Sequence, residues 1–180
     1  MDWMIIAIGI VLLIIIIWCI SISNKFNRLG IRIEESTSGI DVALTKRYDV
    51  LTKMIEVVKG YTKHEKEVFF KVVELRNNMT IKEKNEVNAS MNDDFDKIRV
   101  LAEDYPELKA SENFRTLQKA IVDVEEHLQA ARRLYNSNVS AYNELLLSFP
   151  SSIIASLKGL KRKDFFTAKE EEKDNVNVNI

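Results

Sequence analysis

The fold class of this chain is decided by the stretch Trp3-Met4-Ile5-Ile6-Ala7-Ile8-Gly9-Ile10-Val11-Leu12-Leu13-Ile14-Ile15-Ile16-Ile17-Trp18-Cys19-Ile20. Eighteen of the twenty residues at positions 3–22 are hydrophobic, and none of them is Lys, Arg, Asp or Glu. A helix rises ~1.5 Å per residue, so twenty residues cross the ~30 Å hydrocarbon core of a bilayer. A helix also satisfies its own backbone hydrogen bonds in lipid. The stretch therefore predicts a transmembrane anchor, to which we assign residues 1–23.

The anchor residues that we single out are Trp3, Ile10, Leu13 and Trp18. Trp3 and Trp18 lie near the two ends, where indole rings favour the membrane interface. Two other interpretations are open. A buried core helix would have a polar face within twenty residues, and this stretch has none. A cleaved signal peptide normally opens with basic residues, whereas this chain opens with an acidic one, although positions 21–23 imitate a small-residue cleavage site.

The flanking charges predict the orientation of the anchor. No Lys or Arg precedes it, while Lys25, Arg28 and Arg32 follow it closely. By the positive-inside rule, the C-terminal side faces the cytoplasm. We therefore expect a single-pass protein of the plasma membrane, with its N-terminus outside and the following domain in the cytoplasm.

The composition of the remaining chain argues against several classes of function. Of the 180 residues, 26 are basic and 27 acidic, and one acid precedes the anchor, so the part that follows is neutral. Phosphate binding needs a clustered basic excess, so no nucleic-acid partner is expected. One Cys and two His supply neither a disulfide framework nor a zinc cage. Five Gly and two Pro leave little turn chemistry for a sheet. We expect no metal and no cofactor.

Apolar residues recur at alternating spacings of three and four in two long regions, which is typical of helices that pack lengthwise. The first seam consists of Ile40, Leu44, Arg47, Leu51, Met54, Val58, Tyr61, Glu65, Val68, Val72 and Leu75. The second consists of Phe114, Leu117, Ile121, Val124, Leu128, Ala131, Tyr135, Asn138, Tyr142, Leu145 and Phe149. The two seams predict an all-α fold: an N-terminal transmembrane helix followed by an elongated antiparallel bundle of three to four long helices at residues 24–166.

Residues that favour turns predict how the two seams are connected. Asn, Asp and Ser, which compete with helical hydrogen bonds, are frequent at 85–94, so we expect a loop at about 85–93. A shorter helix should begin with Asp94 as its N-cap and end at Pro106. Ser111 is the expected cap of the last long helix, and Pro150 its end.

Several segments share their order and spacing with one family of proteins. They are Ile40-Asp41-Val42-Ala43-Leu44, Arg47-Tyr48-Asp49-Val50-Leu51, Val57-Val58-Lys59-Gly60-Tyr61, Tyr105-Pro106-Glu107-Leu108-Lys109-Ala110, Ala131-Arg132-Arg133-Leu134-Tyr135-Asn136, Phe149-Pro150 and Phe165-Phe166. In these segments the chain resembles the LemA family of bacterial membrane-anchored helical proteins. It departs at Thr37, where the family usually has Trp, and at Thr52-Lys53, where it has Pro-Asn. The resemblance implies a membrane helix that carries an elongated α-helical domain, and it implies no established reaction.

Few residues offer catalytic chemistry. His64-Glu65 has no second His four residues on, so it is not a zinc-protease helix. Gly60 stands alone rather than in a phosphate loop, and it predicts a close helix contact or a bend. No spacing of residues in the sequence indicates a catalytic triad of a nucleophile, a base and an orienting acid. We expect that the chain is not an enzyme.

Arg47 interrupts the first seam, and a buried polar group needs a partner. If the two long helices pair antiparallel around the central loop, the numbers of facing residues sum to about 190. This register predicts a buried polar pair between Arg47 and Asn143.

A basic and aromatic segment follows the second seam. Its candidate membrane-surface residues are Lys158, Lys161, Arg162, Lys163, Phe165 and Phe166. If the last long helix returns toward the membrane, each cation contributes ~1 kcal/mol of attraction to the anionic leaflet. The other interpretation is a packing segment whose Phe pair covers the bundle. Residues 167–180 are charged or Asn-rich and are predicted to form a disordered tail.

Two functions fit these features. The first is a non-enzymatic structural or protein-interaction role at the membrane, with the lipid bilayer and other proteins as partners. The second is a sensor or signalling adaptor whose bundle passes on a shift of the membrane helix. Seam residues pack equally well between chains, so a homo-oligomer is also open.

Overall fold

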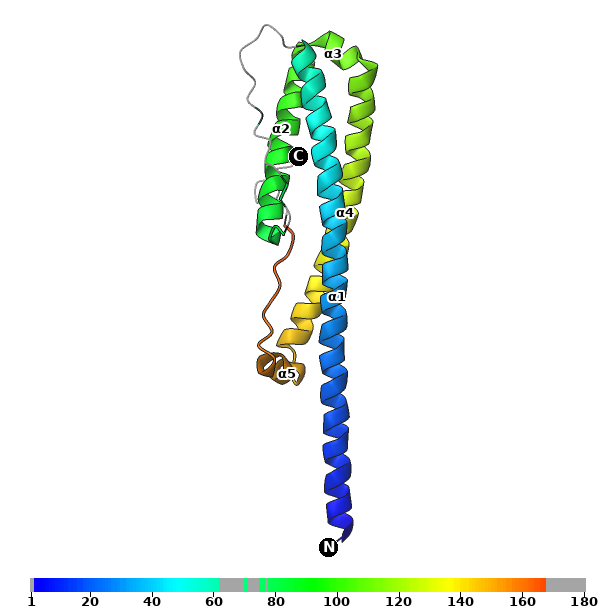
Figure 1. The fold of residues 1–180 in the computed structure, drawn as a ribbon, viewed down its shortest axis with the longest axis vertical. Helices are drawn as coiled ribbons and strands as arrows, with labels where there is room; N and C mark the ends of the chain where they lie inside the picture. The colour runs from blue at the N-terminus through cyan, green and yellow to red at the C-terminus, as the bar shows by residue number, and fades with distance from the viewer. Residues whose placement is uncertain (1, 62–69, 71–74, 77, 168–180) are drawn as a thin grey trace, which may run out of the picture. The chain divides into compact units, whose positions relative to one another are not determined.

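The computed structural model describes the chain at residues 2–61, 70, 75, 76 and 78–167. Its helices are α1 (Asp2–Tyr61), α2 (Ile81–Asp104), α3 (Pro106–Ala110), α4 (Glu112–Leu147) and α5 (Ser151–Leu157) (Figure 1). No β-strand occurs in these described ranges. The prediction of an all-α bundle with a long apolar N-terminal helix is confirmed.

α1 is one helix of 60 residues, drawn from blue to cyan in Figure 1. Its side chains at positions 3–17 are all exposed, and Phe26 has the first fully buried side chain among the described residues. Pro is absent before residue 106, so nothing in the sequence removes a backbone donor from this helix. The apolar part has a window of 18 residues with a mean hydropathy of 3.3, none of it buried, which is long and apolar enough to cross a membrane.

The chain forms two compact units. The first consists of Met1–Thr37 and Leu134–Asp164, and the second of Ser38–Arg133 and Phe165–Ile180. In the first unit, α1 and the end of α4 run antiparallel. Phe26 contacts Tyr142 edge to face, with ring centroids 5.7 Å apart. Asn138 Nδ2 donates to the Arg32 carbonyl at 3.2 Å, so the polar member of the second seam is satisfied by α1.

In the second unit, α2 runs parallel to α1, and α4 runs antiparallel to both. Lys84 of α2 pairs with Asp41 of α1 at 2.5 Å, and Arg47, further along α1, bonds to Asn88, further along α2. Neighbouring parallel helices need a long connection, which here is the chain between Tyr61 and Ile81. The core of this unit consists of Leu51, Met54, Ile55, Val58, Val87, Met91, Ile98, Ala102, Leu108 and Phe114.

The predicted loop at 85–93 is wrong, because α2 continues through it. Asp94 is an interior helical residue, 1% exposed, rather than an N-cap. The helix begins at Thr80, whose Oγ1 accepts the Glu83 N–H at 3.2 Å while Glu83 accepts the Thr80 N–H at 2.7 Å. This capping box satisfies two donors that the first turn leaves open. The side chains of Asn88 and Asn92 in this stretch bond to Arg47 instead of to their own backbone.

The ends of the other helices follow the sequence more closely. The last residue of α1 is Tyr61, and the seam positions Glu65, Val68 and Val72 lie outside the described residues. Leu75 is not helical, although it packs on the core. A Cβ added at Gly60 would meet none of the described atoms within 4 Å, so no contact with the described helices requires a glycine there. Pro106 opens α3 after α2 has ended, and Ser111 Oγ accepts the Phe114 N–H at 3.5 Å at the start of α4, both as expected.

Candidate functional site

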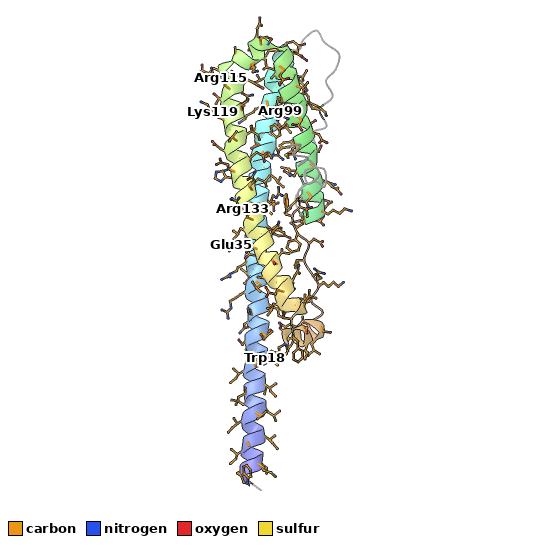
Figure 2. All side chains as sticks on the ribbon, turned by 180° about the vertical axis from the view of Figure 1, so that it is seen from behind. Trp18, Glu35, Arg99, Arg115, Lys119 and Arg133 are labelled. Carbon is orange, nitrogen blue, oxygen red and sulfur yellow. The ribbon has the colours of Figure 1, made fainter. Side chains whose placement is uncertain are left out.

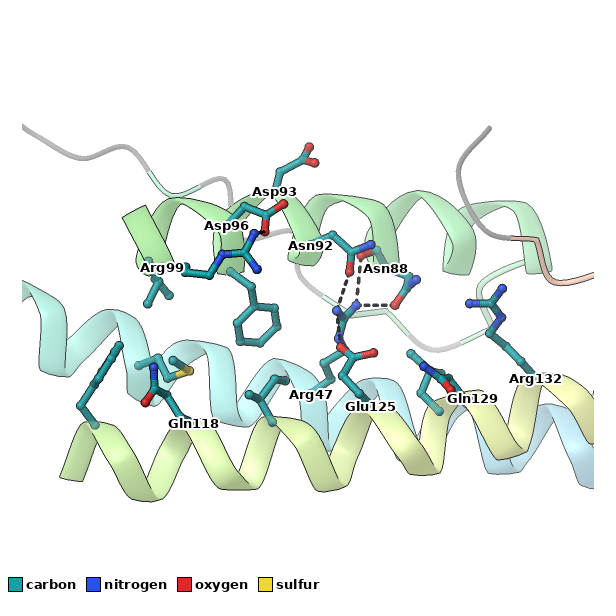
Figure 3. A pocket seen from close by; sticks show the side chains of 16 residues that line it. Arg47, Asn88, Asn92, Asp93, Asp96, Arg99, Gln118, Glu125, Gln129 and Arg132 are labelled. Atoms are coloured by element: carbon teal, nitrogen blue, oxygen red, sulfur yellow. Dashed lines mark hydrogen bonds and ion pairs between the residues drawn. The ribbon is translucent and has the colours of Figure 1, made fainter. Parts of the chain in front are cut away.

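The centre of the second unit is a polar cluster around Arg47, which is 3% exposed. Its Nη1 donates to the backbone carbonyl of Asn88 at 3.1 Å and also to the Asn88 side chain. Its Nη2 donates to Asn92 Oδ1 at 2.5 Å and pairs with the Glu125 carboxylate (Figure 3). The guanidinium carbon lies 5.2 Å from the centre of the Phe95 ring. Three helices thus meet at one charged side chain.

The planar guanidinium explains why this cluster forms. Arg presents several N–H donors in a fixed fork, and it stacks on aromatic faces. Its cost of burial is offset by a carboxylate, a backbone carbonyl, two side-chain amide oxygens and one aromatic ring. Glu125 keeps 35% of its side-chain exposure, so its charge stays partly in water.

A cavity of about 620 Å³ opens beside this cluster, between α2 and α4 and over α1 (Figure 3). Its apolar floor includes Met54, Phe114 and Leu128, and its polar wall includes Asn88 and Glu125. The residues that line its α2 side include Asp96 and Arg99, which pair with each other at 2.7 Å.

The polar side chains that line this cavity are of three chemical kinds. Among the described residues that line it, the polar groups are guanidinium, carboxylate and amide, and none is Ser, Thr, Cys, His or Lys. They are suited to hydrogen bonds and charge complementarity.

The predicted pair between Arg47 and Asn143 is not formed, because each has other partners. Asn143 Nδ2 donates to the Lys163 carbonyl and Asn143 Oδ1 accepts the Lys163 N–H, both at 2.9 Å. The contacts of α1 with α4, such as Arg47 with Glu125, place facing residue numbers at a sum of about 170 rather than 190. The predicted register was wrong because it made the two long helices turn at a loop that is part of α2.

The four residues named as a membrane anchor lie in the apolar part of α1. The exposed fractions are 74% for Trp3, 55% for Ile10 and 59% for Leu13. Trp18 is half-buried, and Figure 2 shows it on α1 where the apolar side chains give way to the packed part of the helix.

The basic residues and the Phe pair separate into different surroundings. Lys158, Lys161, Arg162 and Lys163 are exposed in the first unit. Phe165 is 40% exposed, whereas Phe166 is 1% exposed, with the Arg132 guanidinium 5.6 Å from its ring centre in the second unit. Phe166 is therefore a core residue and not a membrane contact, so the packing interpretation is correct for this position.

In the described part of the chain, no group of three or more His, Cys, Asp or Glu side chains is placed to hold a metal ion. His127 is exposed on α4 beside Asp123 and Glu126. His64 and the predicted tail beyond Thr167 lie outside the described residues.

An exposed apolar helix that continues into a helical bundle defines a class of helical proteins with a candidate single-pass membrane anchor. Within this class, the chain belongs to the LemA family, whose sequence model matches residues 36–180. The resemblance expected from the segments between Ile40 and Phe166 is thereby confirmed.

Curated relatives agree with this family. Protein LemA of Metamycoplasma hominis is 26% identical over 160 residues, which cover 86% of this chain and 73% of that protein. Magnetosome protein MamQ of Magnetospirillum gryphiswaldense is 23% identical over 73 residues, or 41% of this chain and 27% of MamQ. Magnetosome protein MamQ 2 of Paramagnetospirillum magneticum is 25% identical over the same shares. The similarity to the MamQ proteins thus covers about a quarter of their length.

Proposed function

We propose that this chain is a membrane-anchored helical bundle that binds other proteins at the cytoplasmic face of the cell membrane and catalyses no reaction. The observation that carries the proposal is the continuity of α1. Its exposed apolar residues and its buried residues from Phe26 to Val58 belong to one unbroken helix. An exposed apolar run of this length needs an apolar medium. A helix that continues from that medium into the bundle is a stiff connection, which suits a protein that presents a surface at a membrane.

The cavity beside Arg47 is the surface that we assign to a partner protein. Its rim carries both signs of charge, as in the pair of Asp96 and Arg99. A small anion would favour a basic excess, whereas a protein segment with acidic and basic side chains complements a mixed rim. The apolar floor provides the area that such a segment can bury.

Site-specific photo-crosslinking in native membranes tests this assignment. A photoreactive residue at Gln118, which is exposed and lines the cavity, should crosslink to a defined protein. The matched control is Val100, which is 60% exposed and absent from the lining. Crosslinks of equal yield at both positions, or at neither, would contradict a specific partner at this cavity.

The orientation has its own experiment. Cys19 is the sole thiol of the chain, so a Cys19→Ser background allows a single new cysteine to be labelled. A Ser140→Cys change places that thiol on an exposed position of α4. A membrane-impermeant maleimide should label it only after the cells are opened. Labelling in intact cells would place the bundle outside.

The alternative is a sensor, and the same continuity of α1 favours it, because one helix belongs to both the apolar segment and the bundle. A variant with a flexible Gly-Ser insertion after Asn24 distinguishes the sensor from a protein that only presents a surface. A protein that only presents a surface should keep its crosslinks at Gln118. In a sensor, the crosslinks at Gln118 should no longer change with a membrane stimulus, because the insertion interrupts the helix.

A further inference from the structure

The short helix α5 lies beside the point where the apolar part of α1 ends. Lys158, directly after α5, donates a hydrogen bond from its Nζ to Ser23 Oγ of α1. Ser23 directly follows the apolar stretch at positions 3–22. In α1, exposure changes at the same place, because positions 3–17 are exposed while Trp18, Cys19, Ile22 and Ser23 are half-buried. If the apolar part of α1 spans a bilayer, α5 lies at its headgroup layer.

α5 buries two small side chains and exposes two large apolar ones. Its buried positions are Ser151, 4% exposed, and Ala155, 3% exposed. Its outward positions are Ile153 at 51% and Leu157 at 80%, four residues apart on one face. The preceding Phe149 is 83% exposed. An exposed patch of large apolar side chains indicates an interaction with an apolar surface.

The inward Ser151 is satisfied by the protein. Its hydroxyl donates to the Leu145 carbonyl at 2.6 Å, at the end of α4. This bond fixes which face of α5 points inward. The hydrogen bond of Ser151 therefore also fixes the outward orientation of Ile153 and Leu157.

A cluster of cations follows directly. Lys158, Lys161, Arg162 and Lys163 are exposed, and Asp164 is the single acid between residues 151 and 164. Gly159 turns the chain after α5 with a positive φ of 62°, which glycine adopts without strain. The Leu160 N–H then donates to the Ala155 carbonyl at 3.0 Å, which closes the helix in a Schellman motif.

The cationic segment is held in place although it is not helical. Asn143 makes two backbone hydrogen bonds to Lys163, each of 2.9 Å. The Tyr135 hydroxyl donates to the Asp164 carbonyl at 2.8 Å. Since the backbone is fixed, binding has to order only the side chains of the cations, which favours affinity.

We propose that α5 and the segment at 158–163 form a second, interfacial membrane contact that binds anionic phospholipid headgroups. Phe149, Ile153 and Leu157 enter the interface, and the four cations pair with lipid phosphates. The positive charge of the segment favours anionic lipids. Its contact with Ser23 places it next to the membrane that α1 is proposed to cross. This inference rests on the proposed anchoring by α1, and it adds a contact that fixes the first unit against the bilayer.

The test uses the full chain with Cys19→Ser, reconstituted in vesicles of phosphatidylcholine alone or with phosphatidylglycerol. A bimane probe on Leu157→Cys should be quenched several-fold more by lipids brominated near the headgroup when phosphatidylglycerol is present. The same probe on Ile31→Cys is the matched control, because Ile31 is 63% exposed and about 13 Å along α1 from Ile22. It should show little quenching in either vesicle.

Charge is tested with the four changes Lys158→Gln, Lys161→Gln, Arg162→Gln and Lys163→Gln made together. They should abolish the difference between the two vesicle types at Leu157. The control replaces four exposed cations elsewhere, Lys46, Lys53, Lys109 and Lys119, by Gln and should leave the difference unchanged.

Extraction at alkaline pH separates this proposal from the anchoring on which it rests. If the chain is extracted from the vesicles, the anchoring fails. If it stays integrated while the Leu157 probe is not quenched, or is quenched equally after the four changes, the anionic contact is overturned. The first of these results is also the one expected if the apolar face of α5 serves a partner protein instead of lipid.

Discussion

At the scale of single residues, Arg47 is a charged side chain in a heptad position that is otherwise apolar. It forms bonds to Asn88 and Asn92 of α2 and to Glu125 of α4. Removing one member of such a cluster leaves the others without their donor, and buried acceptors without donors are costly. Arg47 is therefore best understood as the residue that fixes the register of three helices.

We expect Arg47→Met to lower the free energy of unfolding by about 2–4 kcal/mol, because Asn88 and Asn92 lose their donor while Met fills only the volume. Glu125→Gln should cost about 1 kcal/mol, since that side chain is partly exposed. Urea unfolding of the full chain in detergent, followed by circular dichroism, measures both. Their double mutant should show a coupling of about 1 kcal/mol.

Asn143→Ala is the control for this cycle, because Asn143 bonds to Lys163 instead. Its effect should add to that of Arg47→Met within about 0.5 kcal/mol. Coupling between Arg47 and Asn143, with none between Arg47 and Glu125, would refute the observed cluster.

Tyr135 gives a prediction about pH. Burial raises the pKa of its hydroxyl from 10.0 to about 12, and the Asp164 carboxylate adds to the shift. The folded state therefore holds this proton more tightly than the unfolded state, so stabilisation is complete below pH 10 and is lost as the pH rises through about 12. Tyr135→Phe should cost about 1 kcal/mol at neutral pH by losing the bond to the Asp164 carbonyl.

The measurement compares the unfolding free energies of the original chain and Tyr135→Phe across this pH range. The gap between them should close toward pH 12. Tyr61→Phe, at an exposed position of α1, should show almost no gap at neutral pH. A gap for Tyr135→Phe that stays constant with pH would contradict the proposed role of its proton.

The residues of the polar cluster show where sequence reasoning ended. The seam identified Arg47 as buried, but its partners depend on the direction of α2, which the spacing of apolar residues does not encode. A signal was present in the sequence. Asn88 and Asn92 lie four residues apart, among Val87, Met91 and Ile98 at helical spacing, and so on one face of a helix.

At the scale of elements, the seams located α1 and α4 well. Their predicted members are buried or half-buried from Ile40 to Val58 and from Phe114 to Leu145. α2 was predicted as a loop because intrinsic propensity was weighted above tertiary contacts, which commonly override it. The capping box of Thr80 and Glu83 would have shown where this helix begins.

Thr80→Ala should lower the free energy of unfolding by about 1 kcal/mol, because it removes the oxygen that accepts the Glu83 N–H. Hydrogen exchange of the first turn of α2 should speed up more than exchange in α4. Bonds from Thr80 lower the pKa of Glu83, so the contribution of the box is present above the ordinary value of 4.5 and is lost as the pH falls.

Thr45→Ala is the matched control within a helix. Its hydroxyl bonds to the Asp41 carbonyl at an exposed site, and Ala is the better helix former. This change should be neutral or slightly stabilising. Equal losses at Thr45 and Thr80 would mean that the capping box contributes nothing specific.

At the scale of the whole molecule, α1 serves two environments along its length. The exposed side chains at positions 3–17 contact no core, whereas Phe26, Leu29 and Ile33 are buried. The apolar part should therefore determine where the protein is located, and the later part should determine whether it folds. These two contributions can be separated by where the chain is shortened.

Deleting residues 2–17 should remove the integral anchor, so that the protein no longer floats with vesicles that lack anionic lipid. It should leave the thermal midpoint within about 3 °C of that of the original chain, because the side chains at positions 3–17 are all exposed. Deleting residues 2–33 also removes Phe26, Leu29 and Ile33 and should lower the midpoint by 10 °C or more, since each lost large side chain costs about 2–5 kcal/mol. Membrane flotation and circular dichroism of both variants provide the comparison. A large drop after the shorter deletion would mean that the apolar segment packs on the bundle, and this would remove the reason for placing it in lipid.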